Sequence, residues 1–315
     1  MNRPAPLVHG RPLLVSIAIV LFVAACAARS GDLGGVATPA PTGGSSRDVP
    51  TAVPTTAADS PGTSPAATPA ASPTGTTRVR TYFFLGSFSG NFGLAPVERQ
   101  IAQTQAVGAA SIGVLLAGPI EPELAASPAM YTSIPDGTRF LGLQISNGVA
   151  TVNLSSEFEA GGDGISVSGR IAQVVYTLTQ FPTVTGVRFE FDGGAPKGVF
   201  SRVFARADYA AFLPAVFVDR PAWGGTLGSP ARVTGMADVF EATFRIAILD
   251  ATGIVLVDQR AMASCGTGCW GTFDVTVPYH VARAQTGTLR VYDLSAKDGS
   301  RENVTEYPVM LTPGG

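Results

Sequence analysis

Two cysteines in the stretch MASCGTGCWG have the types and spacing that could do chemistry. Cys265 and Cys269 are separated by three residues, and Trp270 follows the second cysteine directly. Thiols at this spacing could ligate a metal ion, form a redox pair or close a structural disulfide. The spacing alone does not distinguish these three roles. The cellular compartment helps to distinguish them, because disulfides persist only in an oxidising environment.

The N-terminal residues indicate that the chain is exported. Arg3 and Arg11 accompany an apolar run of 13 residues, Leu13–Ala25. A helix of that length spans about 20 Å, which is short of the ~30 Å hydrocarbon core of a bilayer. We therefore predict a signal peptide over residues 1–25 rather than a transmembrane helix.

The signal ends in Val23-Ala24-Ala25-Cys26, and this sequence resembles the lipobox of bacterial lipoproteins. The resemblance implies that Cys26 is lipidated and becomes the mature N-terminus. The chain would then be held at the cell membrane by its lipid anchor, on the extracytoplasmic face, because several acyl chains give stable anchoring. The alternative is an ordinary secretory signal in which Cys26 is incidental. Either interpretation places the remaining residues outside the cytoplasm.

Export favours the disulfide among the roles open to the cysteine pair. A metal ion would need two further ligands, and a redox pair usually reads C-x-x-C within a βαβ unit. Gly266 and Gly268 allow the tight turn that brings two Cα atoms within about 7 Å. We predict a local structural disulfide between Cys265 and Cys269, without a catalytic role and without a metal. Free thiols are the alternative.

Other residues that could do chemistry are sparse. His280 is the one histidine beyond the signal, and both a zinc site and a Ser-His-Asp triad need more partners than the sequence places near it. Ser166 and Ser168 lie in GISVSG, which lacks the spacing of a nucleophile elbow. We interpret these serines as the start of a helix.

The acidic residues Glu157, Glu159 and Asp163 lie in a glycine-containing segment, but their spacing matches no standard calcium loop. A solvated loop at a helix N-terminus is the favoured interpretation, with calcium as the alternative. The chain has 21 Lys and Arg against 23 Asp and Glu, so it has no basic excess for nucleic acid. We expect no enzymatic activity, no cofactor and no nucleic-acid partner.

The residues after the signal divide into a tether and two folded modules. Residues 26–77 are rich in Ala, Thr, Ser, Pro and Gly and have no aromatic residue, which is typical of a disordered linker. The predicted modules are an α+β domain over 78–194 and an all-β domain over 214–313. A connector over 195–213 joins them.

The α+β module shows clear periodicities. Asn147-Gly148 separates two alternating stretches and predicts a tight hairpin, since both turn positions need positive φ. Ile171, Val174, Val175 and Leu178 predict an amphipathic helix. The expected order is β-β-α-β-β-α-β, forming one small sheet with helices on one face. The expected strands and helices cover, in order, 79–85, 97–101, 106–117, 140–145, 149–154, 165–181 and 187–191.

The second module contains about seven short alternating stretches with turn signals between them, which is typical of a β-sandwich. Its most distinct hairpin joins 244–249 to 254–257 through Asp250-Ala251-Thr252-Gly253. Further strands are expected at 216–218, 273–277, 287–294 and 307–311. No long helix is expected there.

Two stretches of sequence resemble known families. Residues 80 to 194 resemble the GerMN domain of sporulation and spore-germination proteins, through LLAGP, IPDGT, NGVATVNLS and the end of the helix from Gln173 to Phe181. The segments SPARVTGMADVFEATFRIAILDATG, GTFDVTVPY and LRVYDLSAKDGS resemble the immunoglobulin-like domain of bacterial spore-germination proteins. That domain commonly follows GerMN. The resemblance implies an exported envelope protein without known enzymatic activity.

Aromatic residues are concentrated at the start of the first module and in the connector. Core packing is the favoured interpretation, and a contact between modules or with a partner is the alternative. We predict a non-enzymatic binding or scaffold protein whose partner is an envelope protein or peptidoglycan. The alternatives are a wall-acting hydrolase and a sensor of a small ligand. The aromatic residues concerned are Tyr82, Phe83, Phe84, Phe88, Phe92, Phe200, Phe204, Tyr209 and Phe212.

Overall fold

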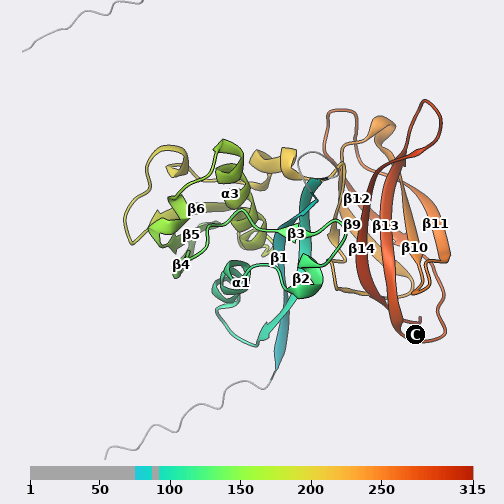
Figure 1. Ribbon diagram of the computed structural model, residues 1–315, viewed down its shortest axis with the longest axis horizontal. Helices are drawn as coiled ribbons and strands as arrows, with labels where there is room; N and C mark the ends of the chain where they lie inside the picture. Colours follow the sequence, from blue (N-terminus) through green and yellow to red (C-terminus); the bar gives the residue numbers. More distant parts are fainter. Residues whose placement is uncertain (1–74, 87–91, 315) are drawn as a thin grey trace, which may run out of the picture. The chain divides into compact units, whose positions relative to one another are not determined.

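The computed structural model describes residues 75–86 and 92–314 (Figure 1). These residues belong to one compact unit. The predicted signal peptide, Cys26, nearly all of the predicted linker and Phe88 lie outside the described residues. The chain forms an α+β domain followed by an all-β sandwich, which confirms the predicted fold class.

The first sheet of the α+β domain is antiparallel, with strand order β2-β1-β3. Strand β1 covers Thr76–Gly86, β2 covers Phe92–Ala102 and β3 covers Met130–Tyr131. The first strand therefore begins two residues inside the predicted linker. The side chains of Tyr82, Phe83 and Phe84 are fully buried, so the aromatic residues at the start of the domain belong to its core.

A second sheet of the same domain has the order β4-β5-β6. Strand β4 covers Phe140–Ser146, β5 covers Val149–Leu154 and β6 covers Gly186–Phe191. Asn147 and Gly148 both have positive φ, 50° and 79°, which confirms the predicted tight hairpin between β4 and β5. Strands β5 and β6 are parallel, as expected of strands joined by a helical crossover.

Three helices complete the domain: α1 over Val107–Leu116, α2 over Glu121–Leu124 and α3 over Gly164–Leu178. Every residue of α3 from Gly169 to Leu178 is buried. The helix contacts β1 of the first sheet and β6 of the second. The prediction of one sheet with helices on one face is therefore wrong, because α3 buries polar as well as aliphatic faces and so packs against both sheets.

Gln173 on α3 and Gln180, two residues beyond its end, explain how the polar face of the helix is buried. The side-chain amide of Gln173 donates to the carbonyl of Tyr82 at 2.9 Å. Gln180 accepts from the amide of Arg80 at 2.8 Å and donates to the carbonyl of Arg80 at 2.7 Å. These backbone groups belong to β1 on the side away from β2, beyond the reach of the two-residue strand β3. The helix thus satisfies a strand edge that would otherwise be buried without partners.

The predicted connector over 195–213 contains two 3₁₀ segments, Gly198–Phe200 and Arg206–Phe212. Phe204 forms a β-bridge with Val187 of β6, and its ring meets that of Phe189 edge-on. The ring of Phe200 meets Phe191 in the same way. The segment therefore joins the two domains while packing as part of the core of the first.

The second domain is a sandwich of two sheets, with strand orders β11-β10-β13-β14-β8 and β12-β9-β7. The predicted hairpin is present as β10 and β11. One cluster of buried hydrophobic residues includes members of both domains. The strands are β7 Val216–Arg220, β8 Thr226–Leu227, β9 Ala231–Ala237, β10 Thr243–Leu249, β11 Val255–Met262, β12 Gly271–Val277, β13 Gln285–Leu294 and β14 Arg301–Leu311.

Candidate functional site at the domain junction

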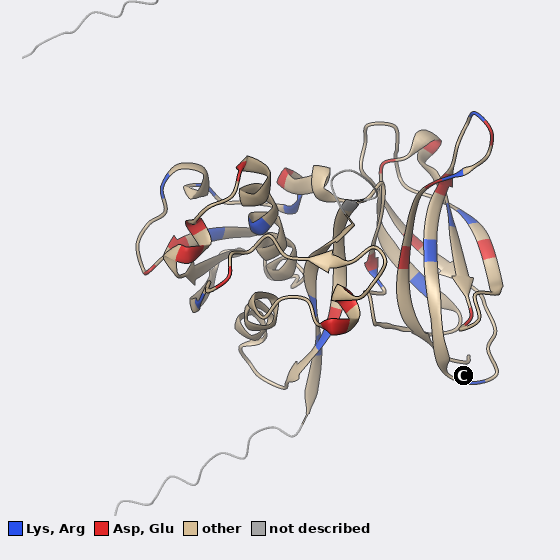
Figure 2. Ribbon diagram, in the orientation of Figure 1, with Lys and Arg blue, Asp and Glu red and all other residues tan. Residues whose placement is uncertain are grey.

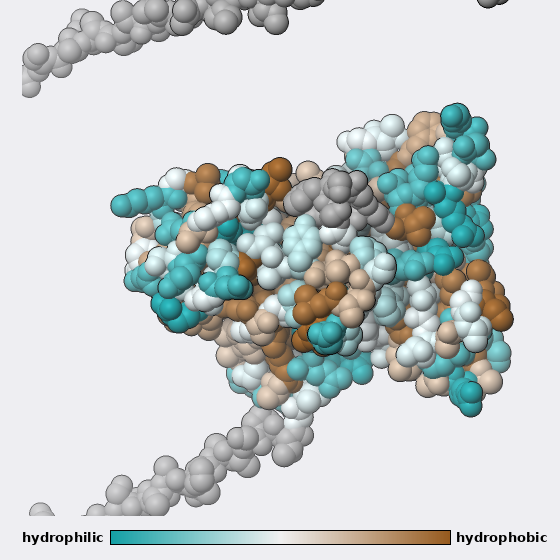
Figure 3. Space-filling view, viewed as in Figure 1, coloured by the Kyte–Doolittle hydropathy of each residue, from teal (hydrophilic) through white to brown (hydrophobic). Residues whose placement is uncertain are grey.

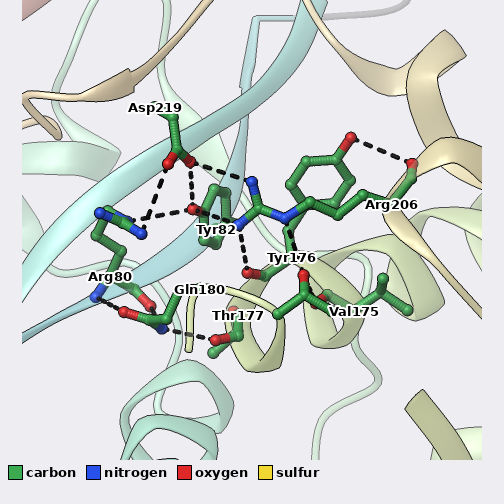
Figure 4. Close-up of polar contacts among 9 residues, drawn as sticks. Arg80, Tyr82, Val175, Tyr176, Thr177, Gln180, Arg206 and Asp219 are labelled. Carbon is green, nitrogen blue, oxygen red and sulfur yellow. Dashed lines mark hydrogen bonds and ion pairs between the residues drawn. The ribbon is translucent and has the colours of Figure 1, made fainter. Parts of the chain in front are cut away.

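A cluster of polar side chains joins the two domains (Figure 4). The hydroxyl of Tyr82 on β1 donates to Asp219 on β7 at 2.6 Å. Two guanidinium groups contact the same carboxylate, that of Arg206 at 3.3 Å and that of Arg80 at 3.5 Å. Tyr82 and Arg80 belong to β1 and Arg206 to the connector that packs on the first domain, so the second domain contributes the carboxylate that this cluster surrounds.

The protonation of this cluster follows from its burial. Burial and the neighbouring carboxylate of Asp219 raise the pKa of Tyr82 to about 12, so the phenol remains a hydrogen-bond donor. Burial alone would raise the pKa of Asp219. The attraction of Arg206 and Arg80 and the hydrogen bond from Tyr82 outweigh that effect and lower the pKa. The junction therefore holds an ionised carboxylate between two cations.

Backbone hydrogen bonds form a second connection between the domains. Trp223 donates to the carbonyl of Pro96 at 2.8 Å and accepts from the amide of Glu98 at 2.9 Å, so it lies alongside β2. The next residue, Gly224, donates to the carbonyl of Pro308 on β14 at 2.8 Å. This short segment therefore bridges a sheet of the first domain and a sheet of the second, which restricts their relative motion.

A cleft of about 460 Å³ lies beside this bridge and is lined by both domains. Its volume is within the range of small-molecule and peptide sites, which occur preferentially between domains. Most of the lining residues are apolar or proline, but polar atoms provide nearly half of the lining surface. The lining residues are Leu85, Gly93, Leu94, Ala95, Pro122, Ala126, Ser127, Pro128, Pro214, Trp223, Thr288, Val304, Thr305, Glu306 and Pro308.

Helix α2 and the residues after it form one wall of the cleft, and a buried ion pair holds this wall in place. Both oxygens of Glu123, which is 3% exposed, accept hydrogen bonds of 2.6 Å from Arg99 on β2. Glu123 also accepts from the amide of Ile120 at 2.9 Å. Figure 2 shows the charged residues of this region. The wall is thus fixed to the sheet by a two-point contact.

The same wall presents apolar side chains to solvent. Ile120 is 52% exposed and Leu124 is 50% exposed. Figure 3 shows apolar atoms gathered over this part of the first domain. Polar groups are available within the cleft as well, because Ser127 and Thr288 line it and Glu306 accepts from Arg290 at 2.5 Å. The arrangement could bind a group that has both apolar and hydrogen-bonding atoms.

The predicted cysteine pair lies in the second domain, and the structure joins Cys265 and Cys269 in a disulfide with Cα atoms 5.8 Å apart. The closed loop connects β11 to β12, the outer strands of the two sheets. Within the loop the amide of Thr267 donates to the carbonyl of Val239 at 3.1 Å. The disulfide therefore pins the connection between the sheets, in keeping with a structural role.

The remaining candidates from the sequence are dispersed. His280 is exposed and does not line the cleft. Asp163 caps α3 by accepting from the amide of Ser166 at 2.8 Å, as expected for a helix start. Glu157 pairs with Arg139 at 3.3 Å. Among residues 75–86 and 92–314 no group of acidic, histidine or cysteine residues could hold a metal ion, and no helix there is long and apolar enough to cross a membrane.

Sequence reasoning missed the residues that build the junction. Asp219 and Trp223 gave no signal beyond a strand end and a turn, because Tyr82, Arg80 and the β2 partners of Trp223 lie more than 100 residues away. The aromatic residues gave a partial signal. Most of them are core residues, but Tyr82 also contacts the second domain, so the two interpretations of the aromatic residues both apply.

Comparison with solved structures gives distant likenesses to parts of the chain. An assumed lipoprotein from Clostridium perfringens is 19% identical, with 42% of this chain and 90% of that chain covered and a TM-score of 0.30. The tandem GerMN domains of the sporulation protein GerM from Bacillus subtilis are 18% identical, with 42% and 45% covered and a TM-score of 0.33. A search of curated proteins found no match.

Comparison with protein-family models gives two matches that follow each other along the chain. Residues 81–196 match a family described as sporulation and spore germination. Residues 215–300 match a family described as the immunoglobulin-like domain of bacterial spore germination. The two matches cover the two domains of the fold. The chain therefore contains a region that matches the sporulation and spore-germination family, followed by a region that matches the immunoglobulin-like domain of bacterial spore germination.

Proposed function

We propose that this chain is a lipid-anchored, extracytoplasmic protein of the cell envelope that binds a partner through the cleft at its domain junction. It acts as a binding or scaffold protein and not as an enzyme. The single observation that carries the proposal is that one cleft is lined by both germination-type domains. A role in sporulation or germination is in keeping with the families of these domains.

The construction of the junction supports binding by a preformed site. The ion cluster around Asp219 and the backbone bridge at Trp223 connect the two walls of the cleft. The wall formed by α2 is fixed separately by the pair of Arg99 and Glu123. A preorganised site loses little conformational entropy when a ligand binds, which favours affinity. The partner is an envelope protein or a fragment of peptidoglycan.

Crosslinking in intact cells tests the proposed site. A photo-crosslinking amino acid at Ser127, an exposed residue of the cleft wall, should capture one dominant envelope protein or peptidoglycan fragments. The same amino acid at Lys297, an exposed residue outside the cleft lining, is the matched control. Adding Trp223→Ala should reduce capture at Ser127, because the side chain leaves the cleft while the backbone bridge remains. Equal capture at both positions would contradict the proposal.

A second candidate function is the sensing of a small ligand. The position of the cleft favours a sensing role, because a ligand between two domains contacts both of them and could change how the domains contact each other. Photo-crosslinking separates the candidates. A scaffold gives covalent adducts with a macromolecule, whereas a sensor gives no macromolecular adduct at Ser127 and shows ligand-dependent protection of the cleft from hydrogen exchange.

The membrane anchor has its own test. A Cys26→Ala variant should escape processing at Ala25-Cys26 and should be lost from the lipid-modified membrane fraction. Metabolic labelling with a fatty acid, followed by fractionation, measures both effects. Normal labelling and processing of the variant would refute the anchor without bearing on the cleft.

A further inference from the structure

Strand edges in this fold are protected in nearly every case. An unprotected edge presents unpaired backbone groups and can pair with another chain, so proteins shorten, charge or cover their edge strands. Strands β3 and β8 have two residues each. Strand β11 carries Asp258 and Arg260, and β12 carries Asp274. Strand β2 is covered by the Trp223 segment, and β6 by its bridge to Phe204.

Strand β4 lacks these protections. It forms the free margin of the sheet β4-β5-β6, as Figure 1 shows. Its sequence, FLGLQIS, contains no charged residue and no proline. Apolar side chains on it are exposed, with Leu141 at 46% and Ile145 at 45%. Among the edge strands of residues 75–86 and 92–314, β4 combines length, neutrality and exposed apolar side chains.

The register of the hairpin shows which backbone groups of β4 are free. The tight turn at Asn147-Gly148 makes Ser146 and Val149 a hydrogen-bonded pair, and such pairs alternate along an antiparallel ladder. Leu143 and Ile145 therefore direct their N–H and C=O groups away from β5. Among the residues that the structure describes, no partner is found for these groups.

We propose that this edge pairs with β4 of a second copy of the chain. An antiparallel pairing about a two-fold axis at Gln144 places Leu143 opposite Ile145 of the partner, and Ile145 opposite Leu143. Both are hydrogen-bonded pairs, so two such pairs satisfy the free groups of both copies. The two apolar side chains share the face that packs against the helices, where Leu143 lies beside Gly108 of α1.

Two features favour a second copy over a different partner. The pairing about Gln144 uses residues 142–146, the regular part of β4, because the register shifts between Phe140 and Gly142. This segment is therefore complementary to itself. It also carries no charge, so two chains of the same negative net charge meet there without like-charge repulsion.

The contact is small, because it consists of five residues from each copy and the side chains beside them. Stable dimers bury considerably more surface, so association in dilute solution is weak. Confinement of many copies to one membrane would raise their effective concentration and strengthen the contact. The pairing itself does not depend on the cleft, so it can fail or succeed independently of the proposed function.

Disulfide crosslinking of the full-length chain tests the register. In the proposed dimer the two Gln144 residues form a non-hydrogen-bonded pair with Cα atoms about 4.5 Å apart, which suits a disulfide. A Gln144→Cys variant should form covalent dimers on mild oxidation, in cells and as purified protein at high concentration. Ser146→Cys is the matched control, because its two copies lie about 13 Å apart along the strands.

The expected result is at least about tenfold more dimer for Gln144→Cys than for Ser146→Cys, since only the former meets the distance requirement of a disulfide. Adding Ile145→Lys to Gln144→Cys should abolish the difference, because it sets a charged side chain opposite the apolar Leu143 in both hydrogen-bonded pairs. Equal yields for the two cysteine variants would overturn the proposal. So would crosslinking of Gln144→Cys to a different protein in place of a second copy.

Discussion

Strands β2 and β4 both lie at a sheet margin in the first domain, but only β2 has its margin covered. The Trp223 segment of the second domain lies along β2 and forms two backbone hydrogen bonds with it. Strand β4 has no such cover among the described residues. The difference indicates that the outer edge of β2 is used for the junction between the domains, while the outer edge of β4 remains available for association.

The largest expected loss of stability comes from breaking the domain junction, whose Trp223 segment covers β2. Asp219→Ala leaves the partly buried guanidinium groups of Arg80 and Arg206 without their shared carboxylate. Loss of one partner from a fully buried ion cluster costs about 3–5 kcal/mol, and the partial exposure of this cluster reduces the expected loss to about 3 kcal/mol. Denaturant unfolding monitored through Trp223 should show this loss. Asp274→Ala, which breaks the exposed pair with Arg232, is the control and should cost much less, because exposed ion pairs contribute little to stability.

The pH dependence of the same variant sharpens the test. The pKa of Asp219 is lower in the folded protein than in the unfolded chain, because its cationic neighbours outweigh burial. The stability that it provides is therefore complete above the unfolded-state pKa of about 3.9 and is lost as the pH falls through the folded-state pKa. The difference between wild type and Asp219→Ala should shrink below about pH 4. A difference that stays constant would contradict the ionic origin.

A second variant tests the margin of β1 that α3 closes. Gln173→Leu keeps the shape of the side chain but leaves the carbonyl of Tyr82 and the amide of Ser133 without their partner. Each buried unpaired group costs about 1–3 kcal/mol, so we expect a loss of about 3 kcal/mol. Gln105→Leu, an exposed position, is the control. Equal stability of the two variants would show that water replaces the lost hydrogen bonds.

These margins also show what the sequence could and could not predict. The hairpin at Asn147-Gly148 and the helix with Ile171 and Val174 follow from local patterns, and both are present. The two-sheet arrangement does not follow, because Gln173 looks like a solvent-facing residue of an amphipathic helix until its partner on β1 is known. Asp219 escaped notice for the same reason, since Tyr82 and Arg80 come from a distant strand and no local pattern marks Arg206 as its partner. Local periodicity is sufficient to predict helices and strands. The partners of buried polar side chains can be identified only once the three-dimensional fold is known.

A third variant tests the disulfide in the loop between β11 and β12. The double change Cys265→Ser and Cys269→Ser should cost about 2 kcal/mol, because the closed loop is short and constrains the unfolded chain only modestly. Thermal unfolding of oxidised wild type, reduced wild type and the double variant measures the effect. Reduced wild type should match the variant. A much larger loss in the variant alone would indicate that the serines disturb the loop itself.

The smallest effect on stability is expected for a substitution on β4, the strand whose outer edge is unpaired among the described residues. Ile145 lies on β4 opposite Ala150, and the two side chains share one face of the sheet, but Ile145 is 45% exposed whereas Ala150 is fully buried. Ile145→Lys can extend its ammonium group into solvent beyond the sheet margin, so the free energy of unfolding should change by less than about 0.5 kcal/mol. Ala150→Lys buries the same charge and should destabilise the domain severely. If Ile145→Lys proves as damaging as Ala150→Lys, then β4 is closed rather than open, and the contrast with β2 disappears.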